Sequence, residues 1–340
     1  MEREQLGRMI RDMLLARRFE ERAAQAYSEG KFGGFLHLYP GEEAVAVGVL
    51  HAAESSDYVV STYREHVHAL VRGVPPGRVM AELFGRRDGC SSGMGGSMHL
   101  FDRERRFMGG YAIVGETFPV AIGIAYGIVL RKLPEAVICF FGEGAANQGT
   151  FHESLNMAAL WRLPVLFVCE NNRYQIGTEI HRQAAVTEIH KRACAYGMAG
   201  ESADGMDVHA VYETAQRMLR AARAGQGPQL LELNTYRFRG HSMADAGAYR
   251  PRAEVEAYKQ ADPLRRVEQD LIAPVERLNH GGAVLDESAM QALRDEIERI
   301  VEDAVAFAEA SPAPSMADAW SALQANRRNE ILIRTEHEHV

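Results

Sequence analysis

Two polar motifs directly follow apolar runs and carry residue types that could bind a charged ligand. The first is Gly142-Glu143-Gly144-Ala145, after the apolar run at 136–141, and the second is Glu-Asn-Asn-Arg-Tyr at 170–174, after the run at 164–169. The spacing between the motifs is enough for one turn, one helix and one strand. Because ligands bind at the carboxyl ends of parallel strands, we expect both motifs at one sheet edge.

Three interpretations of these motifs compete. Tight structural turns would explain the glycines alone. A dinucleotide could bind at a glycine-rich strand-to-helix turn, but the string is GxGxxN rather than GxGxxG, and the Glu143 carboxylate would repel a bare diphosphate. The third interpretation places a cation between the carboxylate and the diphosphate, and it is the one that we favour.

The cation in this interpretation is Mg²⁺, which prefers about six oxygen ligands, including phosphate oxygens. Glu143 could supply a carboxylate, Asn172 its amide oxygen and Tyr174 its backbone carbonyl. A diphosphate would fill two further positions and water the last.

Longer strings resemble a known family. GxG followed by Asn-Asn resembles the thiamine diphosphate motif. The segments GEGAANQGTFHESLNMAALWRLPV, CENNRYQIGT and YRFRGHSM are similar to the alpha chain of the decarboxylating first component of pyruvate dehydrogenase-type complexes. The likeness extends from about Gly34 to about Ala308. It implies a thiamine diphosphate-binding α/β fold, with thiamine diphosphate and Mg²⁺ as cofactors.

The resemblance also implies roles for single residues. Tyr63 and Arg64 would face the diphosphate, and an arginine fork suits phosphate oxygens. Gly144 and Ala145 would offer backbone donors to the same group. Ala112 would meet the aminopyrimidine through its backbone, and Val114 would wedge the cofactor into a bent shape; without the family, Val114 would be taken for a core residue.

Two histidines are catalytic candidates by the same resemblance. His241 would lie on a mobile loop at the mouth of the active site and also contact the cofactor, and His66 would be similarly placed. A lone loop histidine is more often solvated than catalytic, so these roles come from the family. Ser242 occupies a position that is phosphorylated in some relatives.

Two positions depart from the family pattern. Glu143 stands where relatives have Asp, and its extra methylene moves the carboxylate by about 1.5 Å, although Mg²⁺ tolerates little geometric error. Glu42 stands where relatives usually have Gln. We expect a working metal site.

The implied activity is decarboxylation of a 2-oxo acid, with pyruvate the favoured substrate, and transfer of the acyl group to a lipoyl group on an acyltransferase core protein. A separate beta chain would complete the site in an α2β2 assembly. An acetoin dehydrogenase alpha subunit is the alternative. A second alternative, motivated by Glu143, is a non-catalytic or weakly metal-binding subunit of the same fold.

Composition excludes other classes of protein. The 340 residues are 46% hydrophobic and 25% charged, which is ordinary for a folded protein, and the net charge of -8 argues against nucleic acid or anionic membrane as partners. No apolar run is long enough to cross a membrane, and the charged start does not resemble a signal peptide. The four cysteines include no CxxC pair, and we expect a reduced, cytoplasmic protein.

The predicted elements form one α/β domain over 1–340, with a parallel sheet covered by helices on both faces. Strands are expected at 58–62, 136–141, 164–169 and 229–234, and helices at 117–130, 151–161 and 207–223. Helical extensions are expected at 1–55 and 253–325, an exposed loop at 237–252 and a solvated tail at 326–340. Glycines in the segment 89–96 indicate unusual backbone angles or a close approach of the main chain.

Overall fold

The computed structural model describes residues 3–272 and 287–324, and its centre is a parallel sheet with the strand order β2-β1-β3-β4-β8-β7. A short antiparallel hairpin, β5-β6, lies outside it. The strands are β1 (Tyr58–Thr62), β2 (Phe107–Tyr111), β3 (Val137–Gly142), β4 (Val165–Asn171), β5 (Tyr174–Gln175), β6 (Thr178–Glu179), β7 (Ala199–Asp204) and β8 (Gln229–Asn234).

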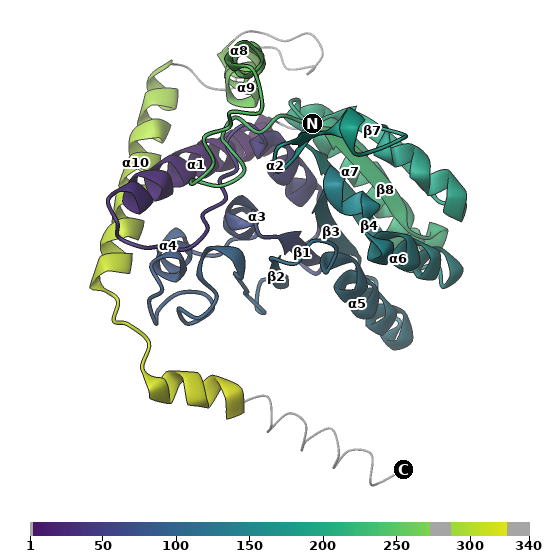
Figure 1. Ribbon diagram of the computed structural model, residues 1–340, viewed down its shortest axis with the longest axis horizontal. Coiled ribbons are helices and arrows are strands. Elements are labelled where there is room, and N and C mark those ends of the chain that lie inside the picture. Colours follow the sequence, from purple (N-terminus) through teal and green to yellow (C-terminus); the bar gives the residue numbers. More distant parts are fainter. Residues whose placement is uncertain (1–2, 273–286, 325–340) are drawn as a thin grey trace.

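Helices surround the sheet (Figure 1). They are α1 (Arg3–Ser28), α2 (Glu43–Ala52), α3 (His66–Val71), α4 (Pro76–Leu83), α5 (Thr117–Arg131), α6 (Gly149–Leu160), α7 (Val208–Ala221), α8 (Arg252–Gln260), α9 (Pro263–Ile272) and α10 (Glu287–Ala310). A further helix covers 316–324. None of the helices among the described residues is both long and apolar enough to span a bilayer.

The central strand β3 shows why its sequence is continuously apolar. Ile138 and Phe140 belong to a buried cluster with side chains of α1, α2, α4 and α7. Cys139 and Phe141, which point to the opposite face, belong to a second cluster with side chains of α5 and α6. Both faces of the strand are therefore buried, as the period-two alternation of a doubly covered sheet requires. The predicted fold class is confirmed.

The two edge strands were not predicted, and their sequences explain why. β2 has the sequence FMGGY and β7 has AGESAD, in which every residue is at least partly exposed. Neither sequence has the apolar run or the alternation that marks a strand. The short helix α3 was also missed, whereas α8 lies almost entirely within the helical extension predicted at 253–325.

The predicted N-terminal and C-terminal extensions lie against each other. α1 packs beside α10, as Figure 1 shows, and Phe19 of α1 joins the same buried cluster as Val301 of α10. The division into a domain with extensions stays a prediction. The tail predicted at 326–340 lies outside the described residues.

A buried aspartate connects several elements at the amino-terminal edge of the sheet, which is the edge opposite the two polar motifs. Asp57 is fully buried just before β1. Its carboxylate accepts hydrogen bonds from the backbone N–H groups of Ala136 at 2.9 Å and Glu54 at 2.8 Å, and it pairs with Arg223 after α7. One carboxylate thus joins β1, β3 and the end of α7.

We predict that Asp57→Ala lowers the free energy of unfolding by about 3 kcal/mol or more, because it leaves a guanidinium and two N–H groups without their acceptor. Denaturant titration followed by circular dichroism measures this loss. Glu104→Ala, at a largely exposed side chain, is the control and should change stability by less than about 0.5 kcal/mol. A loss below about 1 kcal/mol for Asp57→Ala would contradict the account.

Candidate active site

The two polar motifs lie side by side at the carboxyl edge of the sheet. β3 and β4 pair in parallel, and Gly142 lies opposite Glu170 in the register. A cavity of about 340 Å³ opens at this edge. All ten residues proposed as cofactor ligands line it: Tyr63, Arg64, Ala112, Val114, Glu143, Gly144, Ala145, Asn172, Tyr174 and His241. The structure therefore brings these residues together, and their roles toward a cofactor stay predictions.

The turn after β3 places Glu143 inside this cavity. A 3-10 turn covers Glu143–Asn147, and Glu143 is only 2% exposed. Burial raises the pKa of its carboxyl to about 7, and the Gln183 side-chain amide donates to Oε1 at 3.4 Å. A Cβ on Gly144 would lie 2.6 Å from Cγ of the Gln175 side chain, so a larger residue here would have to displace that side chain.

The second motif presents two oxygens from the neighbouring strand. The Asn172 amide nitrogen donates to Glu42 at 3.0 Å, which fixes the orientation of the amide. The backbone carbonyl of Tyr174 accepts a hydrogen bond from Arg237 at 3.3 Å. Glu42 is fully buried, its Oε2 has no partner, and burial raises the pKa of its carboxyl.

Oxygen donors of three kinds thus meet at one edge: a carboxylate, an amide and a backbone carbonyl. No group of three His, Cys, Asp or Glu side chains that could hold a metal occurs within the described residues. A cation at this edge would therefore need further oxygens from its ligand. That requirement matches the way in which Mg²⁺ binds with phosphates.

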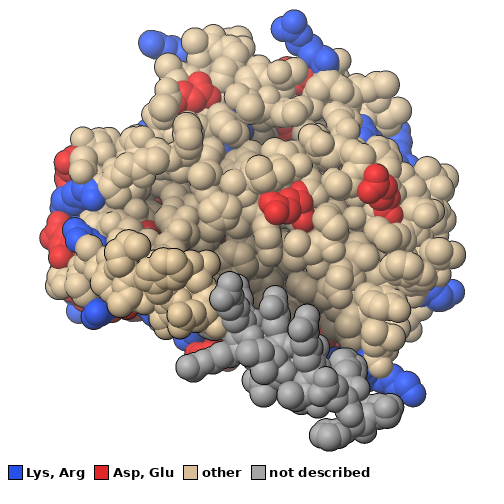
Figure 2. Space-filling model, turned by 60° about the horizontal axis from the view of Figure 1, so that its bottom comes forward, with Lys and Arg blue, Asp and Glu red and all other residues tan. Residues whose placement is uncertain are grey.

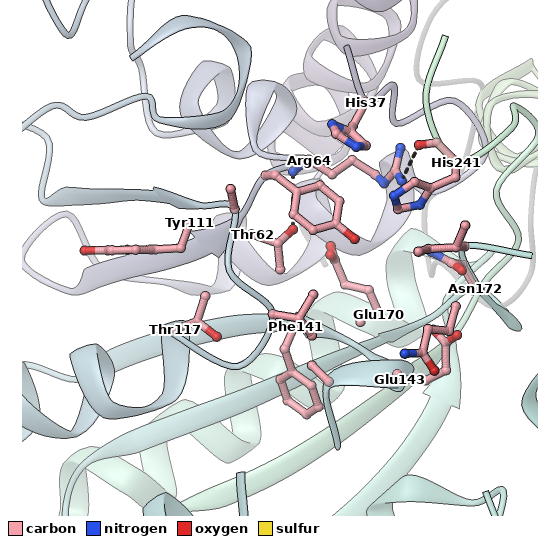
Figure 3. A pocket seen from close by; sticks show the side chains of 18 of the residues that line it. His37, Thr62, Arg64, Tyr111, Thr117, Phe141, Glu143, Glu170, Asn172 and His241 are labelled. Atoms are coloured by element: carbon pink, nitrogen blue, oxygen red, sulfur yellow. Dashed lines mark hydrogen bonds between the residues drawn. The ribbon is translucent and has the colours of Figure 1, made fainter. Parts of the chain in front are cut away.

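Two buried arginines give the cavity a positive wall. Arg64 and Arg237 are 4% and 2% exposed. Arg64 donates to the backbone carbonyl of His241 at 2.9 Å, the contact dashed in Figure 3, and Arg237 donates to the Tyr249 hydroxyl at 3.0 Å. Both guanidiniums are bound by neutral acceptors at these contacts, so their charge is available to an anion that enters.

The prediction of an exposed loop over 237–252 is wrong for two arginines within this range. Arg237 and Arg250 are buried, and Arg250 donates to the backbone carbonyls of Phe238 and Arg239. From sequence alone, an arginine in a segment without apolar periodicity is expected to be exposed to solvent. Here backbone carbonyls of the folded loop accept its hydrogen bonds.

The two catalytic candidates have different surroundings. His241 lines the cavity, with its ring 4.9 Å from that of His37. His66 does not line the cavity, and the prediction that it lies at the mouth of the site is wrong. It begins α3, is fully buried, and bonds to Glu20 at 3.0 Å and to the backbone carbonyl of Ser97 at 3.0 Å.

The surroundings of both cavity histidines, His37 and His241, favour the neutral form of the imidazole ring. Burial, followed by the nearby Arg64 guanidinium, lowers the pKa of His37 to about 2 and that of His241 to about 4. The Nδ1 atoms of both rings are buried without a hydrogen-bond partner. These two Nδ1 atoms are therefore open to a hydrogen bond from a ligand or a water molecule in the cavity.

Several lining residues carried no signal of their own in the sequence. Glu170 belongs to the second motif but was given no role; its carboxylate accepts hydrogen bonds from the Tyr39 hydroxyl and from His68 at 3.0 Å. Glu170 lines the cavity, and Figure 3 shows its side chain near the centre of the group of lining residues. The other residues that sequence reasoning missed include His37, Met98, Tyr111, Thr117 and Arg237.

Comparison with known proteins assigns this arrangement to a family. Residues 11–317 match the family described as "Dehydrogenase E1 component". The chain belongs to the dehydrogenase E1 component family. Its predicted membership in the first-component enzymes is thereby confirmed.

Relatives within this E1 family cover nearly the whole chain. One is the pyruvate dehydrogenase E1 component subunit alpha of Porphyra purpurea, 45% identical, with 91% of this chain and 90% of the relative aligned. The protein of the same name from Rhizobium meliloti is 44% identical over 92% of this chain and 87% of its own. That of Rickettsia conorii is 38% identical over 94% and 95%.

The electrostatics of this E1 site give a pH prediction. In the enzyme without cofactor, the His241 imidazole should remain neutral down to about pH 5, because its pKa is lowered to about 4. Magnesium diphosphate should raise this pKa, because phosphate charge offsets that of Arg64 and Arg237. NMR titration of labelled imidazoles, assigned with His241→Gln, measures both values. A His241 pKa above 6 before ligand is added would contradict the account.

Proposed function

We propose that this chain is the alpha subunit of a pyruvate dehydrogenase first component, which decarboxylates pyruvate on thiamine diphosphate and Mg²⁺. Family membership and the names of its relatives support a 2-oxo acid dehydrogenase component. The observation that carries the proposal is the meeting of Glu143, Asn172 and the buried Arg64 at one cavity.

The donor set fits the diphosphate end of the cofactor. Arg64 and Arg237 would face phosphate oxygens, and the N–H groups of Gly144 and Ala145 would add backbone donors. Glu143, Asn172 and the Tyr174 carbonyl would hold Mg²⁺. When bound, thiamine diphosphate supplies the electron sink that decarboxylation of a 2-oxo acid requires.

The remaining lining residues would shape the rest of the site. Ala112 and Val114 form the wall assigned to the aminopyrimidine and its bent conformation. His241, neutral and with an unpartnered Nδ1, would hold or accept a proton near the reacting end.

Exposed apolar side chains around the cavity support a partner subunit. Phe35, Ile113 and Ile176 line the cavity and are 65%, 70% and 61% exposed. Large apolar side chains gathered at the rim of a binding site are typical of a surface that another chain covers. We therefore propose a beta subunit that completes the site in an α2β2 assembly and covers this rim.

The acyl acceptor in this proposal is a lipoyl group on an acyltransferase core protein, and the compartment is the cytoplasm. All four cysteines are free thiols, which suits a reducing compartment. Nucleic acid is not among the proposed partners. On the face drawn in Figure 2, Lys and Arg side chains lie mainly along the margin and form no continuous basic patch.

Release of CO₂ from carboxyl-labelled pyruvate tests the function. The chain is expressed with its partner chain and assayed with Mg²⁺, thiamine diphosphate and an artificial electron acceptor. Pyruvate should be turned over at least about tenfold faster than branched-chain 2-oxo acids. Cleavage of acetoin without turnover of pyruvate would replace the proposal by the acetoin dehydrogenase alternative. Cofactor binding without any turnover would indicate a non-catalytic subunit.

We predict that Glu143→Ala weakens binding of magnesium–thiamine diphosphate on the order of 100-fold, because the only carboxylate among the three proposed metal ligands is lost. Glu143→Asp, which restores the family residue, should bind at least as tightly as the wild type. Isothermal calorimetry on the assembled enzyme measures both affinities. If the Glu143→Ala enzyme bound magnesium–thiamine diphosphate with wild-type affinity, Glu143 would not be a metal ligand.

A further inference from the structure

The carboxylate of Glu82 is buried at the end of α4 and is surrounded by main-chain donors of one segment. Glu82 is fully buried. Its Oε2 accepts hydrogen bonds from the N–H groups of Ser91 at 2.8 Å and Gly93 at 2.9 Å. Its Oε1 accepts from Gly95 at 2.8 Å and Gly96 at 3.1 Å. Four N–H dipoles thus solvate one carboxylate.

The glycines of this segment are needed for that geometry. Gly93 and Gly96 have φ angles of +74° and +61°, in the left-handed region that favours glycine. A Cβ on Gly89 would collide with the Glu82 carboxylate, and a Cβ on Gly95 would collide with the carbonyl of His99. The glycine-rich sequence at 89–96 is therefore explained by the close approach of the main chain to Glu82.

The segment continues directly into the wall of the cavity. Ser97 bonds to His66 at 3.0 Å, and the next residue, Met98, lines the cavity. The Leu100 N–H donates to the buried carboxyl of Glu65 at 3.1 Å. Two buried carboxyl groups, from Glu82 and Glu65, therefore hold the main chain on either side of Met98.

The same segment supports the strand that leads to the proposed pyrimidine wall. The Gly110 N–H donates to the Leu100 carbonyl at 3.2 Å, and the His99 ring bonds to the Gly110 carbonyl at 3.0 Å. Gly110 lies near the end of β2, just before the lining residues Tyr111 and Ala112. A displaced segment would therefore change two parts of the cavity wall.

We propose that Glu82 is a positioning residue of the active site, which orders residues 89–100 and thereby fixes Met98 against the bound cofactor or substrate. The involvement of cofactor rests on the proposed function. The anchoring of the segment by Glu82 stands on the hydrogen bonds alone. Glu82 itself does not line the cavity, so it acts through the main chain that it binds.

Amide hydrogen exchange on the assembled wild-type enzyme tests the anchor without any variant. The N–H groups of Ser91, Gly93, Gly95 and Gly96 should exchange at least about a hundredfold more slowly than the same sequence in an unfolded peptide. Glu82→Gln should speed this exchange by about tenfold or more, because the amide nitrogen that replaces one oxygen cannot accept a hydrogen bond. Glu135→Gln, at a buried carboxyl just before β3, is the matched control and should leave it unchanged.

Binding and kinetics test the link to the site. Glu82→Gln should raise the KM for magnesium–thiamine diphosphate or for pyruvate by about tenfold, with kcat at saturation within about twofold of wild type. Glu82→Asp, which keeps the charge on a shorter side chain, should give an intermediate KM. Met98→Ala should raise the KM that Glu82→Gln raises, without speeding amide exchange at 91–96. If Glu82→Gln does not fold, Met98→Ala still tests whether Met98 contributes to binding at the site.

The possible results distinguish a failure of the role proposed for Glu82 from a failure of the proposed function. Fast exchange of the four amides in the wild type would overturn the anchor. Faster exchange in Glu82→Gln with an unchanged KM, or an unchanged KM in Met98→Ala, would overturn the positioning role. Failure of the wild type to bind magnesium–thiamine diphosphate would overturn the proposed function while the wild-type exchange still decides on the anchor.

Discussion

The parallel pairing of β3 with β4 is the constraint on which the site depends. Since the register sets Gly142 opposite Glu170, the turn that begins at Glu143 and the segment that begins at Asn172 leave the sheet side by side. A shift of register by one residue would turn every side chain of β3 to the other face and separate these oxygens. Because helices pack against both faces of β3, such a slip would disrupt both apolar clusters as well as the site.

The cavity gathers charges that a protein without a ligand would rarely bury. Arg64, Arg237 and Glu143 are each less than 5% exposed, although burial of a charge is costly unless a partner compensates it. Backbone carbonyls satisfy the two guanidiniums, and a raised pKa keeps the Glu143 carboxyl largely protonated below about pH 7. A metal-bound diphosphate would bring negative charge to the two guanidiniums and a cation that favours the ionised Glu143 carboxylate, so ligand binding and the electrostatics of the site support each other.

The sequence predicted the central strands and most of the proposed site residues. It did not predict the hydrogen-bond partners that surround buried polar groups. The apolar runs before Gly142 and Glu170 predicted two buried strands and their common edge, because period and spacing are local properties. The burial of Arg237, the enclosure of His66 by Glu20 and the fold of 89–96 around Glu82 depend on contacts between distant segments. Residue type alone suggests exposure for such groups, and only the packed structure supplies the acceptors and donors that compensate them.

The position of the cofactor and of the partner chain can be seen in a crystal structure of the enzyme assembled with its partner chain and grown with Mg²⁺ and thiamine diphosphate. We expect the diphosphate at the carboxyl ends of β3 and β4, with Mg²⁺ bound by Glu143, Asn172 and the Tyr174 carbonyl. We also expect the partner chain to cover the apolar rim at Phe35, Ile113 and Ile176. A cofactor bound elsewhere, or a complete site formed by this chain alone, would show that the proposed site is wrong.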